Sequence, residues 1–298
     1  MNGLAVIFAL LLVGVALRRL NALPAGTAEV LNRFVLHVTV PALVLLRIPS
    51  LAFSRTLLLP ALLPWVALAA SAAAVLAFAR LRALDRATTG VLLMLAPLGN
   101  TSFLGFPMVE ALLGRDALPY AVFYDQFGSF VAVTTYGSIV LARCGAAGRP
   151  SLRSVLRRVL TFPPFLAFLV ALATRGLAYP APAVALLEAL ASTLLPLIMI
   201  AVGLQLRIRL EGAERLPLAF GLAVKMLLAP AIVLAVCRAV GAHDDAARAS
   251  ILESAMPPMV TAGALASAAG LAPRLAAALV GLGLLLSFLT LPLLARFL

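Results

Sequence analysis

The sequence predicts an all-α integral membrane protein, on the basis of composition, run length and charge placement. Hydrophobic residues make up 64% of the 298 residues, charged residues only 11%, and the mean hydropathy is +1.13. A soluble domain carries about 25% charged residues. Several apolar runs reach the roughly 20 residues that a spanning helix needs. The formal charge of +12 does not indicate a nucleic-acid partner, because the arginines lie between apolar runs and not on one soluble face.

Ten apolar runs are expected to span the bilayer. The first is followed by the basic pair Arg18 and Arg19. This is the reverse of the order in a secretory signal peptide, so the run is interpreted as a span that begins outside. The gaps between runs are too short for a soluble domain. The predicted spans are residues 3–17, 27–48, 57–79, 87–112, 117–141, 160–177, 182–206, 216–239, 246–271 and 273–296.

The arginines between the spans predict the orientation, because cytoplasmic loops are enriched in Lys and Arg. Fourteen of these arginines fall on one side of the predicted spans and seven on the other. The bias places both termini outside and the central basic loop, 142–159, in the cytoplasm. A multi-pass protein of the cell's cytoplasmic (inner) membrane is therefore expected, with the lipid bilayer as its surroundings.

The two halves of the chain repeat one another. Four prolines and one glycine of the first half recur in the second half at offsets between 155 and 160 residues. The pairs are Pro24 and Pro180, Pro41 and Pro196, Pro60 and Pro217, Pro97 and Pro257, and Gly114 and Gly270. Each half holds five spans, an odd number, so the second copy must be inverted, as is common in secondary transporters. The predicted organisation is a first repeat over 1–141, the loop 142–159 and a second repeat over 160–298.

Two segments interrupt predicted spans at membrane depth, residues 96–107 in the fourth and 255–263 in the ninth. Irregular backbone is tolerated there only where protein buries it or where it lines a cavity. Broken helices in corresponding positions of two repeats are a pointer to a transporter's binding site. A kink in tightly packed helices is the alternative, disfavoured by the Asn-Thr-Ser run and the repeat pairing. The breaking residues are Pro97, Pro107, Pro257 and Pro258.

Polar residues beside the breaks are the candidate substrate ligands. The N-termini of half-helices carry free N–H groups and partial positive charge, so they attract anions. Asn100, Thr101 and Ser102 follow the first break, where they could cap the next half-helix or donate to a ligand. Pro107 removes a further backbone donor and frees a carbonyl. Thr261 is the polar residue near the second break.

Ionisable and amide side chains at membrane depth are costly and usually functional. Gln126 in the fifth span is expected to contact the substrate. Asp125 could carry a coupling proton or pair with a neighbouring helix. Glu253, one turn before the second break, could bind a proton, but a structural ion pair with Lys225 is the favoured interpretation. Arg33 in the second span could attract anions in a vestibule or extend its charge from a helix end.

Four other polar residues lie in or near the spans. His37 is expected to pack and not to bind a ligand. Glu188 and Ser192, one turn apart, could line the scaffold side of the pocket. Glu110 is expected near the outer membrane surface.

Motifs for other functions are missing from the sequence. It contains no phosphate-binding Walker motif, no zinc-ligand spacing and no Ser/His/Asp or Cys/His arrangement. Cys144 and Cys237 fall on opposite predicted sides, so neither a disulfide nor a metal site is expected. The sequence therefore predicts no enzyme, no cofactor and no ATP-driven step within this chain.

Three segments carry a resemblance to a known family. They are Ala-Pro-Leu-Gly-Asn-Thr-Ser-Phe-Leu-Gly-Phe-Pro (96–107), Ser-Ala-Met-Pro-Pro (254–258) and Leu-Asn-Arg-Phe-Val-Leu-His-Val-Thr-Val-Pro-Ala-Leu (31–43). Together with the ten-span pattern, they resemble the auxin efflux carrier family over essentially the whole chain. The central loop is shorter than that of the long plant carriers. The pair Pro257 and Pro258 replaces the expected single proline followed by a small or polar residue.

The resemblance implies a fold similar to sodium–bile acid symporters and sodium–proton antiporters. Spans 1, 2, 6 and 7 would form a scaffold, and spans 3–5 and 8–10 a mobile transport domain with the broken helices 4 and 9 crossed. Members of the family move organic anions, including indole-3-acetate in plants, and bacterial members are linked to malate and malonate. A homodimer formed through the scaffold is expected by analogy.

The predicted function is a secondary carrier of a small organic anion, a mono- or dicarboxylate, that works by elevator-like alternating access. An alternative is a sodium- or proton-coupled symporter of bile-acid-like or amino-acid-like solutes. A membrane sensor that binds a ligand without moving it is the alternative from a different class.

Overall fold

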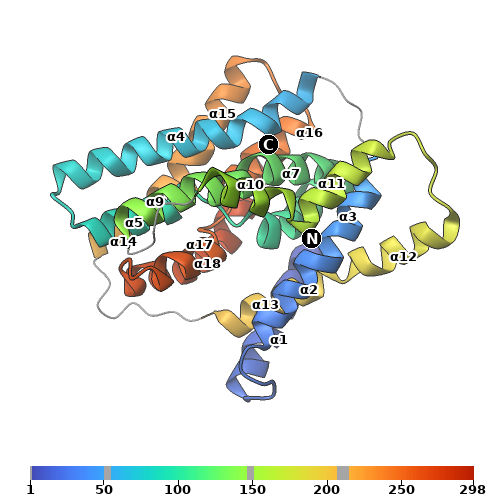
Figure 1. Cartoon of the computed structure of the whole chain (residues 1–298), viewed down its shortest axis with the longest axis horizontal. Coiled ribbons are helices and arrows are strands. Elements are labelled where there is room, and N and C mark those ends of the chain that lie inside the picture. Colours follow the sequence, from blue (N-terminus) through green and yellow to red (C-terminus); the bar gives the residue numbers. More distant parts are fainter. Residues whose placement is uncertain (1, 50–54, 146–150, 207–214) are drawn as a thin grey trace.

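The chain is helical throughout the computed structural model, which describes residues 2–49, 55–145, 151–206 and 215–298 (Figure 1). Within these ranges no strand forms, and the β-type pairing is limited to one antiparallel bridge between Gly99 and Pro258. The predicted all-α class is confirmed.

The helices of the first half follow the predicted runs. Turns of 3-10 or π helix carry η labels. In order, the elements are α1 (Asn2–Arg19), α2 (Thr27–Phe34), η1 (Val35–Thr39), α3 (Val40–Arg47), η2 (Arg55–Leu57), α4 (Leu58–Leu81), α5 (Arg86–Leu95), η3 (Thr101–Gly105), α6 (Phe106–Leu113), η4 (Arg115–Ala117), α7 (Leu118–Tyr124), η5 (Asp125–Ser129), α8 (Phe130–Ala132), η6 (Val133–Gly137) and α9 (Ser138–Cys144).

The helices of the second half also follow the predicted runs, except for one additional helix, α10, at the start. The elements are α10 (Leu152–Leu160), α11 (Pro163–Ala173), α12 (Ala181–Ser192), α13 (Leu194–Gln205), α14 (Arg215–Ala223), η7 (Val224–Leu228), α15 (Ala229–Ala239), α16 (Asp245–Ser254), α17 (Val260–Ala268) and α18 (Pro273–Ala295). Helix α10 lies in the segment 142–159 that was expected to be a loop, and the residues 146–150 of that segment lie outside the described part.

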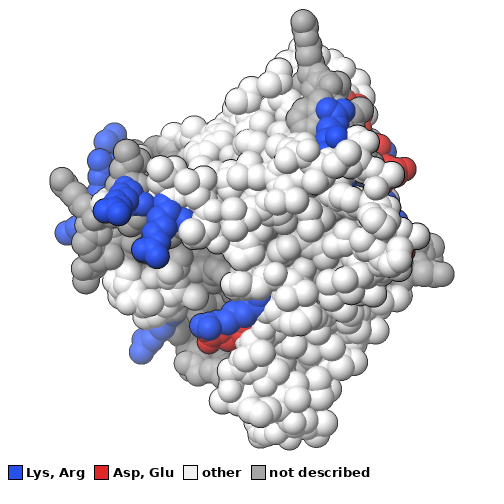
Figure 2. All heavy atoms as spheres, turned by 45° about the vertical axis from the view of Figure 1, so that its right-hand side comes forward, with Lys and Arg blue, Asp and Glu red and all other residues white. Residues whose placement is uncertain are grey.

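Six continuous helical segments are long and apolar enough to cross a membrane: Thr27–Arg47, Leu58–Leu81, Arg115–Cys144, Ala181–Gln205, Arg215–Ala239 and Pro273–Ala295. The other predicted spans correspond to α1, to the shorter α11 and to two interrupted helices. Figure 2 shows one face of the molecule that is broadly uncharged, with most Lys, Arg, Asp and Glu side chains toward its margins. The protein is a multi-pass membrane protein.

Three π-helical turns come directly before a proline. Turns η1, η3 and η7 are followed by Pro41, Pro107 and Pro230, each within the first two residues of the next α-helix. Proline has no N–H and its ring clashes with the carbonyl four residues earlier. A π turn inserts one residue into the helix, and such bulges are frequent at functional sites. Pro107 therefore sits in a continuous η3–α6 helix and does not end it.

The helices form two groups that meet along an apolar interface. The first group contains α1–α3 and α11–α13, and the second contains α4–α9 and α14–α18. One buried apolar cluster contains residues from both groups, such as Ile7 and Leu43 of the first and Phe106 and Leu252 of the second. Another buried cluster lies wholly within the second group. In Figure 1, α4 and α15 of the second group run side by side.

Within the first group, α1 packs along α13 and α11 along α3 (Figure 1). Gly14 and Gly203 let α1 and α13 approach so closely that a Cβ built on Gly203 would lie 2.4 Å from the Leu11 carbonyl oxygen. Small residues at such contacts are typical of membrane helix pairs. The helical segments Thr27–Arg47 and Ala181–Gln205 meet through two hydroxyls, because Thr39 Oγ1 and Thr193 Oγ1 are 2.8 Å apart.

Candidate functional site

The two broken helices cross and are joined by their backbones. The Asn100 N–H donates to the Pro257 carbonyl at 2.8 Å, and the Met259 N–H donates to the Leu98 carbonyl at 3.0 Å. The two segments are buried throughout, from 95 to 101 and from 255 to 259. Backbone groups without water must find partners inside the protein. At this crossing each break satisfies one donor and one acceptor of the other.

The outer ends of the two broken helices are capped in the same way. Asp85 accepts hydrogen bonds from the backbone N–H groups of Ala87 and Thr88 at the start of α5. Asp244 accepts one from the Ala247 N–H at the start of α16. An acidic N-cap satisfies free N–H groups and complements the helix dipole. Both half-helices that lead to the crossing therefore begin at a fixed position.

Asp125 ties the first break to the fifth span. Its Oδ1 accepts hydrogen bonds from Thr101 Oγ1 at 2.5 Å and from Ser102 Oγ at 2.6 Å, and its Oδ2 accepts one from Gln126 Nε2 at 2.8 Å. Asp125 and Gln126 are buried in η5. The structure therefore brings four of the predicted site residues together, and Asp125 makes the helix-pairing contact that was one of its two expected roles.

The same network engages the two hydroxyls and leaves the Asn100 amide outside it. Thr101 and Ser102 donate to Asp125, so these hydroxyls are occupied by an internal partner. Asn100 occupies the N-cap position of η3, but its side chain makes no capping hydrogen bond within the described residues. The buried Asn100 Nδ2 and Gln126 Oε1 have no hydrogen-bond partner among the described residues. A buried polar group without a partner costs about 1–3 kcal/mol, which a ligand could recover.

Lys225 and Glu253 do not form the favoured ion pair. Lys225 Nζ donates to the Ser254 carbonyl at 2.9 Å, and both buried carboxylate oxygens of Glu253 lack a hydrogen-bond partner in the described part of the chain. Among the described residues, the ion pairs within 4.0 Å lie elsewhere. The last carbonyls of a half-helix have no intrahelical donors and carry partial negative charge. That end of α16 attracts the ammonium group in place of Glu253.

The crossing is closed in this conformation. Pro97, Gly99, Tyr124, Lys225 and Glu253 line a cavity of about 10 Å³ beside it, roughly the room for one water molecule. Gly99 lets Lys225 pack close to the crossing, because a Cβ on Gly99 would lie 3.0 Å from Lys225 Nζ. An organic anion does not fit beside the crossing without movement of the surrounding helices.

Two larger cavities open between the two helix groups, each of about 690 Å³. The α2–α17 vestibule is lined by Glu29, Asn32, Arg33, Phe103, Gln205 and Thr261. The α3–α6 vestibule is lined by Arg47, Pro107, Glu110, Arg115, Glu188 and Ser192. Thr261, predicted beside the second break, thus faces a vestibule. Glu188 and Ser192 line a cavity as expected.

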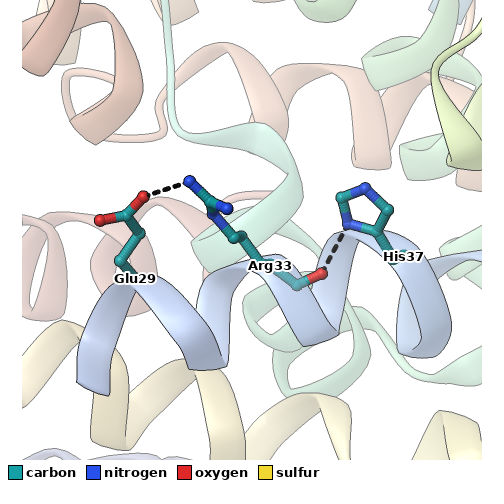
Figure 3. Close-up of polar contacts among 3 residues, drawn as sticks. All are labelled: Glu29, Arg33 and His37. Atoms are coloured by element: carbon teal, nitrogen blue, oxygen red, sulfur yellow. Dashed lines mark hydrogen bonds and ion pairs between the residues drawn. The ribbon is translucent and has the colours of Figure 1, made fainter. Parts of the chain in front are cut away.

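Arg33 lines the α2–α17 vestibule, which agrees with the first of its two predicted placements. Its Nη2 is 2.6 Å from Glu29 Oε1, and His37 Nδ1 is 2.8 Å from the Arg33 carbonyl oxygen (Figure 3). A matching pair that was not predicted lies in the other vestibule, where Arg115 Nε is 3.0 Å from Glu110 Oε1. The available signal was a glutamate five residues before an arginine just after the end of a predicted span.

Residues with metal-ligating side chains are dispersed. Within the described ranges, no three His, Cys, Asp or Glu side chains gather in a group that could hold a metal ion. Cys144 and Cys237 are both free thiols.

Comparison with known proteins gives a consistent set of relatives. The family described as "Membrane transport protein" matches residues 1–295. An uncharacterised transporter of Methanothermobacter thermautotrophicus is 28% identical over 291 residues, covering 96% of this chain and 94% of the relative. An uncharacterised transporter of Methanocaldococcus jannaschii is 28% identical over 215 residues, covering 69% of this chain and 68% of the relative.

Proposed function

Because the chain belongs to the membrane transport protein family, we propose that it is a secondary transporter of a small organic anion, a mono- or dicarboxylate. The crossing of the two broken helices carries this proposal. Half-helix N-termini favour negative charge, and the buried Asn100 Nδ2 is a donor without a partner. A carboxylate at the crossing would accept hydrogen bonds from the N–H groups of a half-helix N-terminus and from Asn100 Nδ2. Asn100 is the residue assigned to substrate binding, with Gln126 beside it.

The proposed architecture is ten spans in two inverted repeats of five. Several paired features support it. Helix α1 packs on α13 as α11 packs on α3, and an aspartate caps both α5 and α16. Gly128 and Gly283 are 155 residues apart, and a Cβ on either would clash with a side chain of another helix or break. These pairs extend the offsets already seen in the sequence.

Transport would follow an elevator-like alternating access. The first helix group serves as the scaffold, and the second moves against it across the shared apolar interface. Such an interface has few directional contacts to break, which favours sliding. The two vestibules lie on this boundary, and the closed crossing lies between them. With both termini outside, the α2–α17 vestibule faces the cytoplasm and the α3–α6 vestibule faces outward, in the cytoplasmic membrane.

Coupling to sodium or protons is the second candidate, and Glu253 favours it. Its two carboxylate oxygens are buried without a hydrogen-bond partner, and an isolated buried charge is far more costly than a neutral or ion-bound group. Glu253 and Asp125 are the proposed coupling residues. In this version the protein is a symporter, and uptake depends on an imposed sodium or pH gradient.

The test is counterflow in proteoliposomes with a panel of labelled mono- and dicarboxylates, alongside thermal stabilisation of the purified protein, since a bound ligand raises the melting temperature. Wild type is expected to exchange at least one carboxylate, and Asn100→Ala to lose both the exchange and the stabilisation. Asn21→Gly, in a turn with positive φ, is the matched control and should behave as wild type. Normal exchange by a well-expressed Asn100→Ala variant would refute the proposal.

A further inference from the structure

Each vestibule contains one exposed pair of an arginine and a glutamate on its wall. In the α2–α17 vestibule, Arg33 pairs with Glu29 at 2.6 Å, and their side chains are 72% and 67% exposed. In the α3–α6 vestibule, Arg115 pairs with Glu110 at 3.0 Å, with 72% and 35% exposure. A third pair, Arg248 with Asp245, lines neither vestibule. The charge pairs of the vestibules are thus matched in type and placement.

The two vestibules, each with its pair, open at opposite ends of the segments Thr27–Arg47 and Ala181–Gln205. Arg33 lies near the start of the second span, and Arg47 of the other vestibule lies at its end. Fourteen helical residues separate them, roughly 20 Å at 1.5 Å per residue. The seventh span is arranged in reverse, with Glu188 in the α3–α6 vestibule and Gln205 in the other. A solute that crosses the protein therefore passes one pair on the way in and the other on the way out.

Within the described residues, each of the two guanidinium groups makes one hydrogen bond and keeps further N–H donors for a ligand. One hydrogen bond joins Arg33 Nη2 to Glu29, and one joins Arg115 Nε to Glu110. A guanidinium carries five N–H donors in a fork that matches a carboxylate in two-point contact. Exposed ion pairs of this kind are weak and screened by salt. A glutamate held by one hydrogen bond can therefore be replaced by a solute carboxylate that binds the guanidinium group with both oxygens.

The surroundings of each pair favour a polar solute. Asn32, Gln205 and Thr261 supply amide and hydroxyl groups around Arg33. Arg47 adds a second positive charge near Arg115, and Ser192 adds a hydroxyl. A released Glu29 stays hydrated, because its side chain is already two-thirds exposed. In the α2–α17 vestibule the exchange consequently buries no unpaired charge.

We propose that Arg33 and Arg115 are the recruitment sites for the anionic solute at the two ends of its path. The solute carboxylate takes the place of Glu29 or Glu110, and each glutamate closes its site again when the solute moves on. The proposal rests on the proposed function and names a site that lies apart from the crossing. In the purely structural alternative, Glu29 and Arg33 form an ordinary i,i+4 pair that supports helix α2 and does not meet solute.

Sided kinetics distinguish these two roles. Counterflow of labelled malonate, with malate as the second probe, is measured in proteoliposomes sorted by the accessibility of a C-terminal tag, so that each face is assayed alone. Arg33→Gln is expected to raise KM about fivefold at the face of the α2–α17 vestibule and to leave the other face unchanged. Glu29→Gln is expected to lower KM at the same face, because the competing carboxylate is gone, and Arg33→Lys to retain part of the affinity.

Arg115→Gln and Glu110→Gln should give the same pattern at the opposite face, and the control Arg248→Gln should change neither. The inference is overturned if Arg33→Gln and Glu29→Gln leave KM unchanged, or shift it in the same direction, while wild type carries the probes. Loss of carriage in Asn100→Ala together with unchanged KM in these variants overturns this inference alone. Absence of any malonate or malate flux in wild type overturns it together with the assignment to these dicarboxylates.

Discussion

The carboxylate of Glu253 occupies the space that Gly105 leaves by having no side chain. A Cβ built on Gly105 would lie 2.3 Å from Glu253 Oε2 and 2.5 Å from Oε1. Gly105 belongs to η3 of the first broken helix and Glu253 to α16 of the second, and both are buried. The two breaks are thus held together by side-chain packing as well as by their backbone hydrogen bonds.

Gly105→Ala is expected to destabilise the protein even though alanine is the better helix former. The methyl group would force Glu253 to move, and overpacking of this kind costs about 1–3 kcal/mol. The measurement is the melting temperature of the purified protein. The double variant Gly105→Ala with Glu253→Ala removes the clash. Its loss of stability should therefore be smaller than the sum of the losses in the two single variants. A Gly105→Ala variant as stable as wild type would contradict the packing described.

Asp125→Ala is expected to cost more stability than Asp125→Asn. The alanine variant leaves the buried donors of Thr101, Ser102 and Gln126 without their acceptor, at about 1–3 kcal/mol for each group that finds no substitute. The asparagine variant keeps one acceptor oxygen at the same place. Chemical unfolding of both variants in one detergent checks the order. Equal stabilities would show that the hydrogen bonds to Asp125 contribute little.

Gly203→Ala is expected to separate α1 from α13. The added Cβ would meet the Leu11 carbonyl oxygen at 2.4 Å and Gly14 Cα at 2.8 Å, and backbone atoms cannot turn aside as a flexible side chain can. Gly137→Ala is the control, since its Cβ would meet atoms no closer than 3.5 Å. The first variant should lower the melting temperature clearly and the second should change it little. The opposite order would refute the close approach of α1 and α13.

Asp85→Ala is expected to cost about 1 kcal/mol through loss of the α5 N-cap. Hydrogen bonds from the side chain and backbone of Thr88 lower the pKa of the Asp85 carboxyl below its usual value of 3.8, against a smaller opposing effect of burial. A lowered pKa in the folded state means that this stabilisation is present above the unfolded-state pKa and is lost as pH falls through the folded one. The difference in unfolding free energy between wild type and Asp85→Ala should therefore be constant near neutral pH and should disappear in strong acid.

Much of the fold could be predicted because helix position depends on local sequence. The amino-acid sequence alone shows the apolar runs, the prolines near helix ends and the paired breaks. The described helices accordingly lie within a few residues of the predicted runs. The resemblance drawn from the segments around Asn100 and Pro257 is confirmed, since the family match covers residues 1–295.

Side-chain partners were harder to predict because they depend on how helices turn toward one another. Helices that are apolar on every side give no periodic signal for the facing direction. Lys225 and Glu253 were therefore matched by charge alone, whereas the ammonium group binds the Ser254 carbonyl. Thr101 and Ser102 likewise could not be assigned to Asp125, which is more than twenty residues away in sequence.

The hydrogen bonds at the crossing are reciprocal, and reciprocity has a consequence for ancestry. Leu98 offers a carbonyl and, two residues later, Asn100 offers an N–H; Pro257 and Met259 do the same for the other break. A segment of this kind complements a second copy of itself turned by half a rotation, as a two-fold interface does. In the proposed architecture of two inverted repeats, two separate copies of one five-span unit, inserted in opposite directions, would form the same contact. The segment that connects the halves then adds nothing to the chemistry of the crossing.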